Sequence, residues 1–213
     1  MRIPLLSVLL CLLPLAHADD TARCTVGGWV KLHLVDAQGQ ESDYSISDAA
    51  TEIPLYALPD IKSDILHTLP TAFGDISYDY IAVELIAPAQ QGRFPVLAYA
   101  YGSETPQPLH GWLDKEAIAL ALQTPHLHES PDSASRTRLS LTDGDWLSDM
   151  GSITLRNCQQ NWVHIDYRQH TRRSAGDLAD IPESEQTVLS GWANHSCALM
   201  ETPCDGESAT TAP

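Results

Sequence analysis

A motif that occurs twice constrains the fold of this chain more than any other feature. Residues 55–63 align without gaps with residues 127–135, and the two stretches share a leucine, the pair Pro-Asp and a serine at the same offsets. Each copy then runs on to a Gly-Trp pair, which is Gly111-Trp112 in the first and Gly191-Trp192 in the second. Similarity of this kind predicts a duplicated structural unit.

The segments between these motifs alternate apolar and polar residues, or are rich in β-branched residues, as is typical of half-buried strands. The expected strands are residues 29–35, 80–86, 95–101, 151–155 and 162–167. The best helical period covers residues 114–122, where we expect a short helix capped by Asp114. Short strands with Gly, Pro and Asp between them indicate an all-β protein.

The repeated unit resembles a known family. It opens L-x-x-x-P-D-x-x-S, continues with W-V-x-I-x-Y and closes with G-W, and in this it is similar to the bacterial SH3-like (SH3b) domain. The resemblance implies two tandem small β-barrels, with residues 162–167 as a central strand of the second. Residues 94–99 take that place in the first copy with a looser match. Residues 102–110 and 169–189 are insertions longer than ordinary barrel loops.

The expected organisation has five parts. They are a signal peptide (1–18), an N-terminal β segment (19–50), a first SH3-like domain (51–122), a second SH3-like domain (123–204) and a disordered acidic tail (205–213).

The first eighteen residues have the order of features found in a cleaved secretory signal. Arg2 is followed by an apolar run over residues 3–15 and by the small-residue pattern of residues 16–18. The run is shorter than the ~20 residues that span a bilayer, which argues against a membrane anchor. A lipoprotein would use Cys11, but the leucines before it fit that signal poorly. We therefore expect a periplasmic or secreted product with no integral membrane segment after cleavage.

The charge of the chain excludes one class of partner. The formal net charge is −16, and loss of the +1 of Arg2 with the signal peptide would leave −17. Such a surface repels nucleic-acid phosphates, so we expect no nucleic-acid binding, and a cationic partner is favoured over an anionic one. The acidity also serves solubility alone in many exported proteins.

Cysteine usage agrees with export. Without Cys11 the chain keeps an even number, Cys24, Cys158, Cys197 and Cys204, which in an oxidising compartment predicts disulfides. Four cysteines allow three connectivities. Pairing of Cys197 with Cys204 is the local option and would leave Cys24 for Cys158. Zinc is the competing use, but no close C-x-x-C pair is present.

Few residues suggest catalysis or metal chemistry. No G-x-S-x-G elbow occurs, and disulfide-bonded cysteines cannot act as nucleophiles. The carboxylates Asp143, Asp145, Glu183 and Glu185 are expected on any solvated face of so acidic a chain. His126 and His128 alternate on one side of an extended segment and are the weak candidates for metal ligands. We expect no enzyme and no cofactor.

Aromatic side chains are the candidates for ligand binding. In the resemblance they would line a groove, and in a small barrel the same residues also serve the core. The candidates are Tyr56, Tyr99, Trp112, Trp162, Tyr167 and Trp192.

The resemblance implies a non-catalytic binding protein whose modules engage peptidoglycan or a periplasmic protein. The alternative is an acidic inhibitor or immunity-type protein that blocks a basic exported enzyme, motivated by the net charge. A metal-binding periplasmic protein is a third possibility.

Overall fold

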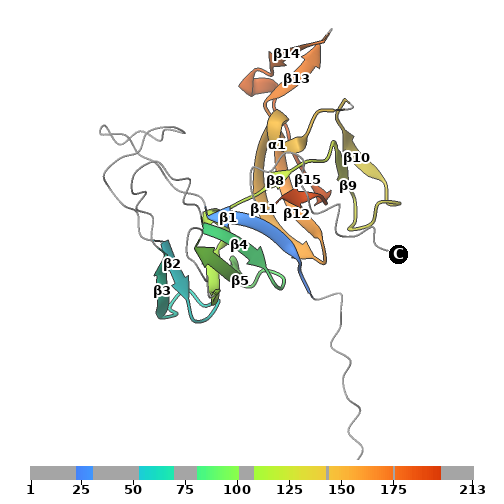
Figure 1. Ribbon diagram of the computed structural model, residues 1–213. Helices are drawn as coiled ribbons and strands as arrows, with labels where there is room; N and C mark the ends of the chain where they lie inside the picture. Colours follow the sequence, from blue (N-terminus) through green and yellow to red (C-terminus); the bar gives the residue numbers. More distant parts are fainter. Residues whose placement is uncertain are drawn as a thin grey trace, which may run out of the picture.

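The regular structure of this chain is almost entirely β (Figure 1). The computed structural model describes residues 23–30, 53–69, 81–100, 108–142, 144–174 and 176–197. Within them the one α-helix is α1 (Leu147–Met150), and no helix there is long and apolar enough to cross a membrane. The all-β class predicted from the strand pattern is confirmed.

The larger sheet contains seven antiparallel strands in the order β3-β2-β6-β5-β4-β1-β7. Its strands alternate buried and partly exposed residues, as in β1 and β4, which is why one face of the sheet lies against the core. The strands are β1 (Val26–Val30), β2 (Ile53–Tyr56), β3 (Ile65–Leu69), β4 (Ile81–Leu85), β5 (Arg93–Ala100), β6 (Leu109–Asp114) and β7 (Ile118–Ala119).

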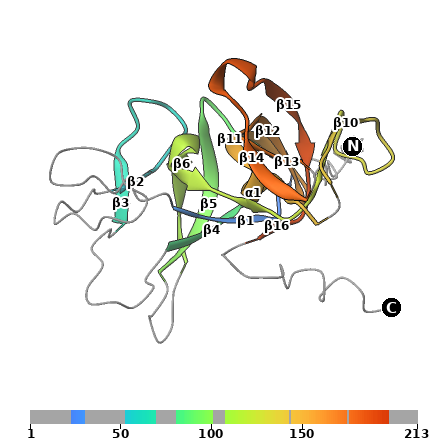
Figure 2. The ribbon, with the colours of Figure 1, turned by 90° about the horizontal axis from the view of Figure 1, so that it is seen from above.

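The second sheet contains five strands in the order β10-β9-β15-β12-β11 and lies beside the first in both views (Figures 1 and 2). Two short ribbons accompany it, β13 with β14 and β8 with β16. The strands are β8 (Ala121–Leu122), β9 (His126–His128), β10 (Thr137–Ser140), β11 (Gly151–Gln159), β12 (Trp162–Gln169), β13 (Thr171–Ser174), β14 (Asp177–Asp180), β15 (Val188–Ala193) and β16 (Ser196–Cys197).

The repeated motif has a structural counterpart. We call β2 to β6 the first unit, and β9 to β12 with β15 the second unit. In each unit the five strands follow the same spatial order, namely second, first, fifth, fourth, third. Two segments of one chain therefore have one topology.

The loop after the first strand is built in the same way in both units. Its aspartate accepts a hydrogen bond from the backbone N–H two residues on, and its serine hydroxyl accepts one from five residues before, as in Asx and related turns. These bonds are Lys62 N–H to Asp60 at 2.7 Å, Ala134 N–H to Asp132 at 2.8 Å, Leu58 N–H to Ser63 at 2.8 Å and Ser130 N–H to Ser135 at 3.3 Å. The shared Asp and Ser thus form the same loop twice.

The glycine of each Gly-Trp pair allows the fifth strand to approach the first. A Cβ on Gly111 would lie 2.4 Å from Leu55 Cγ, and one on Gly191 would lie 2.7 Å from Leu127 Cγ. Both distances are too short for real atoms, so the close approach needs glycine. The leucine and the glycine of the repeat therefore contact each other in both units.

The fourth strands align one residue away from the match read in the sequence. Val96 pairs with Gly111 in the first unit, whereas Ile165 pairs with Gly191 in the second. Phe94 therefore corresponds to Val163, not to Trp162. Arg93 takes the place of Trp162, and this polar residue hides the equivalence from a search for apolar motifs.

The helix expected over residues 114–122 is wrong. The segment forms a single 3-10 turn at Lys115–Ala117 and then β7 and β8. Ile118, Leu120 and Leu122 are buried at alternate positions, which is the period of a strand. Asp114 makes no capping bond, because its carboxylate accepts a bond from Arg93 Nε at 2.8 Å.

The described part of the N-terminal segment belongs to the larger sheet. β1 lies between β4 and β7, with Trp29 opposite both Ala82 and Ala119. The expected strand 29–35 thus begins earlier, at Val26, and is described only as far as Val30. The predicted signal peptide (1–18) and acidic tail (205–213) lie outside the described residues.

The expected insertions differ in how far they are described. Most of residues 102–110 lie outside the described residues, and Leu109–Asp114 forms β6. Residues 169–189 contain the β13–β14 hairpin, which projects beyond the second sheet at the top of Figure 1, and the 3-10 turn Glu183–Glu185.

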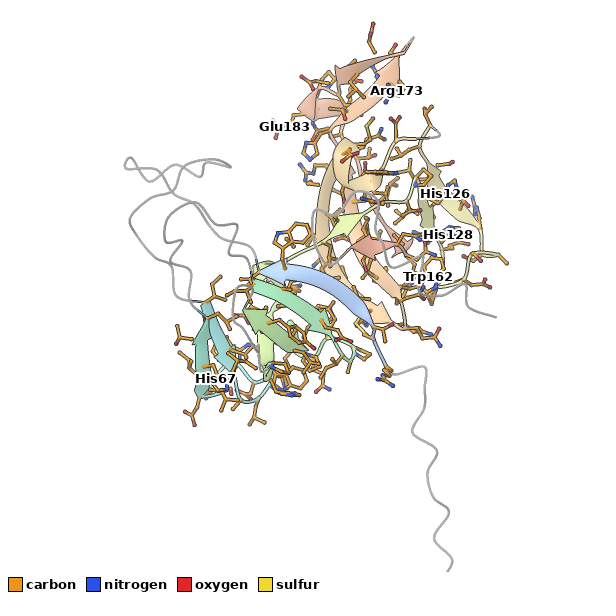
Figure 3. The ribbon with its side chains drawn as sticks, viewed as in Figure 1. His67, His126, His128, Trp162, Arg173 and Glu183 are labelled. Carbon is orange, nitrogen blue, oxygen red and sulfur yellow. A yellow bond between two sulfur atoms is a disulfide. The ribbon has the colours of Figure 1, made fainter. Side chains whose placement is uncertain are left out.

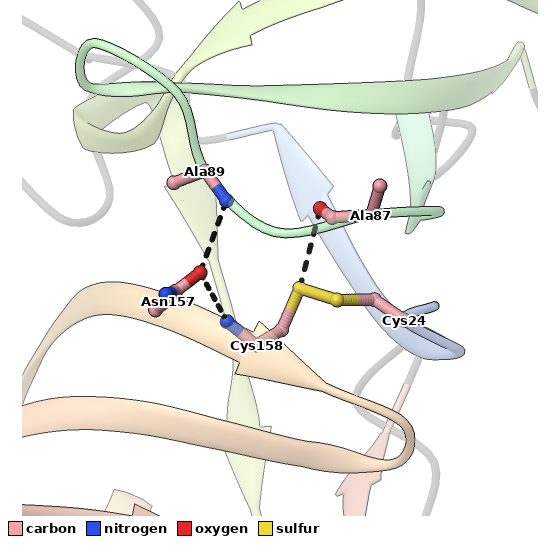
Figure 4. Close-up of a disulfide and its surroundings, with 5 residues drawn as sticks. All are labelled: Cys24, Ala87, Ala89, Asn157 and Cys158. Atoms are coloured by element: carbon pink, nitrogen blue, oxygen red, sulfur yellow. Dashed lines mark hydrogen bonds between the residues drawn. A yellow bond between two sulfur atoms is a disulfide. The ribbon is translucent and has the colours of Figure 1, made fainter. Parts of the chain in front are cut away.

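A disulfide between Cys24 and Cys158 joins the N-terminal segment to the second unit (Figure 4). Both cysteines are 1% exposed, and the Cys158 sulfur lies 3.4 Å from the carbonyl oxygen of Ala87. Beside it, Asn157 Oδ1 accepts a hydrogen bond from Ala89 N–H at 3.0 Å. One of the predicted pairings is thus confirmed, while Cys204 lies outside the described residues and its pairing with Cys197 stays a prediction.

Candidate functional site

The six candidate aromatic residues have different degrees of burial. Tyr167 is completely buried and Trp162 is 7% exposed, so these two belong to the interior and the prediction that they line an open groove is wrong for them. Both lie on β12. The four half-buried candidates are Tyr56, Tyr99, Trp112 and Trp192.

One position holds a contact between two planar side chains in both units, with different chemistry and different geometry. In the first unit the Arg93 guanidinium lies 3.4 Å from the centre of the Tyr56 ring. In the second unit His128 meets Trp162 edge to face, with ring centres 5.4 Å apart. His128 corresponds to Tyr56 and Trp162 to Arg93, and Arg93 also donates to the Leu58 and Asp60 carbonyl oxygens of its loop. These residues are structural.

The outer face of the second sheet is different, because it brings polar and aromatic side chains together at a half-exposed surface. His164 on β12 lies opposite Trp192 on β15, and their rings stack with centres 5.0 Å apart and an interplanar angle of 29°. Two residues further along β12, Asp166 lies opposite Ser190. We call His164, Asp166, Ser190 and Trp192 the polar face.

Two arginines flank the polar face. Arg156, at a bulge of β11, donates from Nε to Asp166 Oδ2 at 2.7 Å. Ser190 donates its hydroxyl to the other oxygen of the same carboxylate. From β10, Arg138 donates to the Ser190 carbonyl oxygen at 3.0 Å. The carboxylate is thus fixed in position while both guanidinium groups remain accessible, with side chains 44% and 45% exposed.

These contacts set the charge of the face. Hydrogen bonds from Arg156 and Ser190 hold the pKa of Asp166 below its usual value. Burial lowers the pKa of His164, and Arg138 and Arg156 act in the same direction, while Asp166 opposes them. The imidazole is therefore neutral at pH 7 and can both donate and accept a hydrogen bond.

The first unit has no such polar face. The strand pairing places Pro95 opposite Trp112 and Leu97 opposite His110, where the second unit has His164 with Trp192 and Asp166 with Ser190. The scaffold is shared, but the polar groups occur in one copy. They are therefore not required for the fold itself.

The two histidines considered as metal ligands lie near each other but in separate surroundings. His126 and His128 have ring centres 6.0 Å apart, as labelled in Figure 3. His126 Nδ1 lies 3.2 Å from the Ser140 hydroxyl, and His128 is 7% exposed against Trp162. Within the described residues no three His, Cys, Asp or Glu side chains gather as a metal site would need.

The chain was compared with family models, curated proteins and solved structures. No family model, no curated protein and no solved structure matches it. The chemistry of the polar face therefore has to be judged from its own residues.

The polar face offers an aromatic surface together with hydrogen-bonding and charged groups. The half-buried Trp192 gives a flat apolar contact, neutral His164 gives a donor and an acceptor, and the arginines can meet carboxylate groups. Such a mixture suits a small polar ligand or a peptide. Among the sequence candidates only Trp192 belongs to it.

His164, Asp166 and Arg156 were not predicted from the sequence. A signal for two of them was present, because alternation along residues 162–167 puts Trp162, His164 and Asp166 on one side of the strand. The contribution of Arg156 depends on the bulge between Leu155 and Asn157, and no sequence pattern predicts this bulge.

Proposed function

We propose that this chain is an exported, non-catalytic binding protein, and that the polar face of its second unit binds a peptide. The single observation that carries the proposal is the half-exposed Trp192–His164 stack beside the fixed Asp166 carboxylate. A peptide supplies amide groups for His164, carboxylates for the two arginines and an apolar surface for Trp192.

Two sources of peptide fit this chemistry outside the cytoplasm. One is the stem peptides of peptidoglycan, and the other is a segment of a periplasmic protein. We also propose that each unit is a small SH3-like barrel, which is supported by the identical strand order and loop hydrogen bonds of the two units. Export is supported by the signal-like pattern of residues 1–18 in the sequence and by the Cys24–Cys158 disulfide.

The test exploits the duplication. Trp192→Ala should weaken binding to purified peptidoglycan or to its soluble stem peptides by at least about 10-fold, as expected for a central aromatic contact. Trp112→Ala is the matched control, since Trp112 holds the equivalent position opposite Pro95 and should leave binding unchanged. Binding would be measured by co-sedimentation with cell walls and by calorimetry with the peptides.

The outcomes separate the two sources. Retention on cell walls that is lost only in Trp192→Ala supports the peptidoglycan source. Binding to peptides of periplasmic proteins without wall retention, again lost only in Trp192→Ala, supports the protein source. Equal loss in Trp112→Ala and Trp192→Ala, or no binding of either ligand, contradicts the proposal.

The charge of the chain favours a second candidate, an acidic inhibitor of a basic exported enzyme. A formal net charge of −16 would steer association with a positively charged cleft. In that case association with a basic enzyme slows steeply as salt rises, because charge steering is screened beyond about 10 Å at 0.1 M. An association rate that does not change with salt contradicts it.

A further inference from the structure

The first unit exposes four large apolar side chains close together in sequence. They lie in the loop between β2 and β3 and at the start of β3, and they are Leu58 (59% exposed), Ile61 (84%), Ile65 (58%) and Leu66 (52%). We call these four residues the apolar loop patch. Scattered surface leucines need no explanation, but a cluster of this kind marks an interaction surface.

The second unit shows that the loop does not need them. The two loops share their hydrogen bonds, and the backbone N–H of Ala57 and of Glu129 bind Asp64 O and Arg136 O at 3.0 and 2.9 Å. Each first hairpin also has a bulge at the same place, which Leu66 occupies in one and Arg138 in the other. The counterparts of the apolar loop patch are Ser130, Ser133, Thr137 and Arg138.

The apolar loop patch is not needed to form the loop. Serine, threonine and arginine stand on the same backbone in the second unit without loss of the loop geometry. Apolar side chains stabilise a fold when they are buried away from water. Four exposed apolar side chains therefore add nothing to the stability of the fold. The apolar loop patch is therefore a feature of the surface of the first unit.

The patch continues into a strand edge. β3 is the outermost strand of the larger sheet among the described residues, and both views place it at the side remote from the second unit (Figures 1 and 2). Within the described part of the chain β3 pairs with β2 alone (Figure 3, where His67 marks the strand). An edge strand offers backbone donors and acceptors in a row to another extended segment.

The charges around the patch indicate which segment fits. Asp60 and Asp64 lie among the apolar side chains in the sequence, with Lys62 between them, and all three are exposed. The whole chain carries a net charge of −16. A second copy of the chain would bring the same excess of negative charge to the contact, whereas a basic segment would be attracted.

We propose that the apolar loop patch and β3 dock an extended segment of a partner protein that alternates apolar and basic residues. The segment adds to the sheet along β3, its apolar side chains cover Ile61, Ile65 and Leu66, and its basic side chains meet Asp60 and Asp64. This site lies on the first unit and is separate from the polar face of the second, so it goes beyond the proposed function.

The probe is a synthetic peptide of about ten residues that alternates valine and lysine, with a fluorescent label, titrated with the full chain. Two peptides serve as controls: one has glutamate in place of lysine, and one has N-methylated backbone amides that cannot pair with a strand edge. We expect binding of the first peptide, and binding at least about 10-fold weaker for each of the others.

The decisive variant replaces two patch residues with those of the second unit. Ile61→Ser with Ile65→Thr changes no charge, and both new residues already occupy this loop and strand position in the second unit, so folding is retained. Peptide binding should fall by at least about 10-fold. Leu178→Ser is the matched control, since Leu178 is equally exposed (60%) but lies on the β13–β14 hairpin.

Three results would overturn the proposal. One is equal binding of the lysine and glutamate peptides, and another is binding that is unchanged in the double variant or lost equally in Leu178→Ser. The third is a dimer in sedimentation that the double variant dissociates, because the patch would then belong to a contact between copies. Loss of binding of the lysine peptide in the double variant, together with unchanged binding of that peptide by Trp192→Ala, separates this site from the polar face.

Discussion

Tyr167 places a phenol in the interior of the second unit. Its side chain is fully buried, and its hydroxyl has no hydrogen-bond partner among the described residues. Burial without a partner costs the desolvation of the hydroxyl and raises the pKa of Tyr167 well above its usual value of about 10. The hydroxyl therefore costs stability, while the buried ring fills the core.

We predict that Tyr167→Phe raises the free energy of unfolding by about 1 kcal/mol at pH 7, since the ring remains and the unpaired hydroxyl is removed. A second effect appears in alkali. The unfolded chain ionises this tyrosine near pH 10 while the folded chain does not, so the wild type loses stability as the pH rises above about 10. The variant loses less over that range.

Urea unfolding at pH 7 and at pH 11 would measure both effects. Tyr99→Phe is the control, because Tyr99 is half-buried at the surface of the first unit. A Tyr167→Phe variant that is less stable than the wild type at pH 7 would contradict the prediction.

At the residue scale, the sequence predicted the repeat where the same residue type makes the same contact in both units. The repeated Asp, Ser and Gly each make the same contact in both units, and the repeat was found through them. Arg93 and Trp162 occupy one position with unlike side chains, so no search by type could align them. A missed signal was the pair Gln90-Gln91 and Gln159-Gln160, which precedes both residues and fixes the correct register.

The β13–β14 hairpin is attached to the second unit through a buried carboxylate. Asp145 is 4% exposed, and Arg173 on β13 donates to its Oδ1 and Oδ2 from Nε at 3.1 and 3.3 Å. These bonds raise the pKa of Arg173 further. A buried carboxylate without its partner destabilises a fold strongly, so loss of this ion pair should be costly.

We predict that Arg173→Met lowers the melting temperature, because it leaves Asp145 charged and unpaired in the interior. Asp145→Asn in the same chain should restore part of the loss, since the second change removes the buried charge. Arg136→Met is the control, as its side chain is 80% exposed and 3.9 Å from Glu129, and surface pairs contribute little. Calorimetry would measure the three variants, and equal losses for Arg173→Met and Arg136→Met would contradict the prediction.

At the element scale, strands were predicted where the alternation is local and long. β4, β5, β11 and β12 all fall within or across the expected ranges. The helix expected over residues 114–122 failed, because Ile118, Leu120 and Leu122 follow a strand period that is too short to be decisive alone. The β13–β14 hairpin was expected only as an insertion.

The disulfide between Cys24 and Cys158 links distant parts of the chain covalently. Cys24 and Cys158 are separated by 134 residues, and a cross-link over so long a loop removes much entropy from the unfolded chain. Cys24→Ala with Cys158→Ala should lower the free energy of unfolding by about 3–5 kcal/mol.

Denaturant unfolding of the oxidised wild type and the double variant would measure the difference. Reduction of the wild type should bring its midpoint close to that of the double variant, whereas reductant should affect the double variant much less. Equal midpoints for the oxidised wild type and the double variant would contradict the prediction.

At the scale of the molecule the sequence revealed two related units but not how they are joined. β1 pairs with β4 and β7, and Thr25 N–H binds Gln160 O of the second unit at 2.8 Å. Contacts between residues so far apart leave no local pattern. The cysteine count allowed the Cys24–Cys158 link without selecting it, and the geometry of the fold decides it.

The position of that link also orders events in time. A chain emerges N-terminus first, and no cysteine lies between Cys24 and Cys158. Cys24 therefore meets its partner only after β9, β10 and most of β11 have appeared, and the bond closes a ring that holds the first unit and the start of the second. The bond can act as a checkpoint of maturation, because a molecule that carries it has brought both units together.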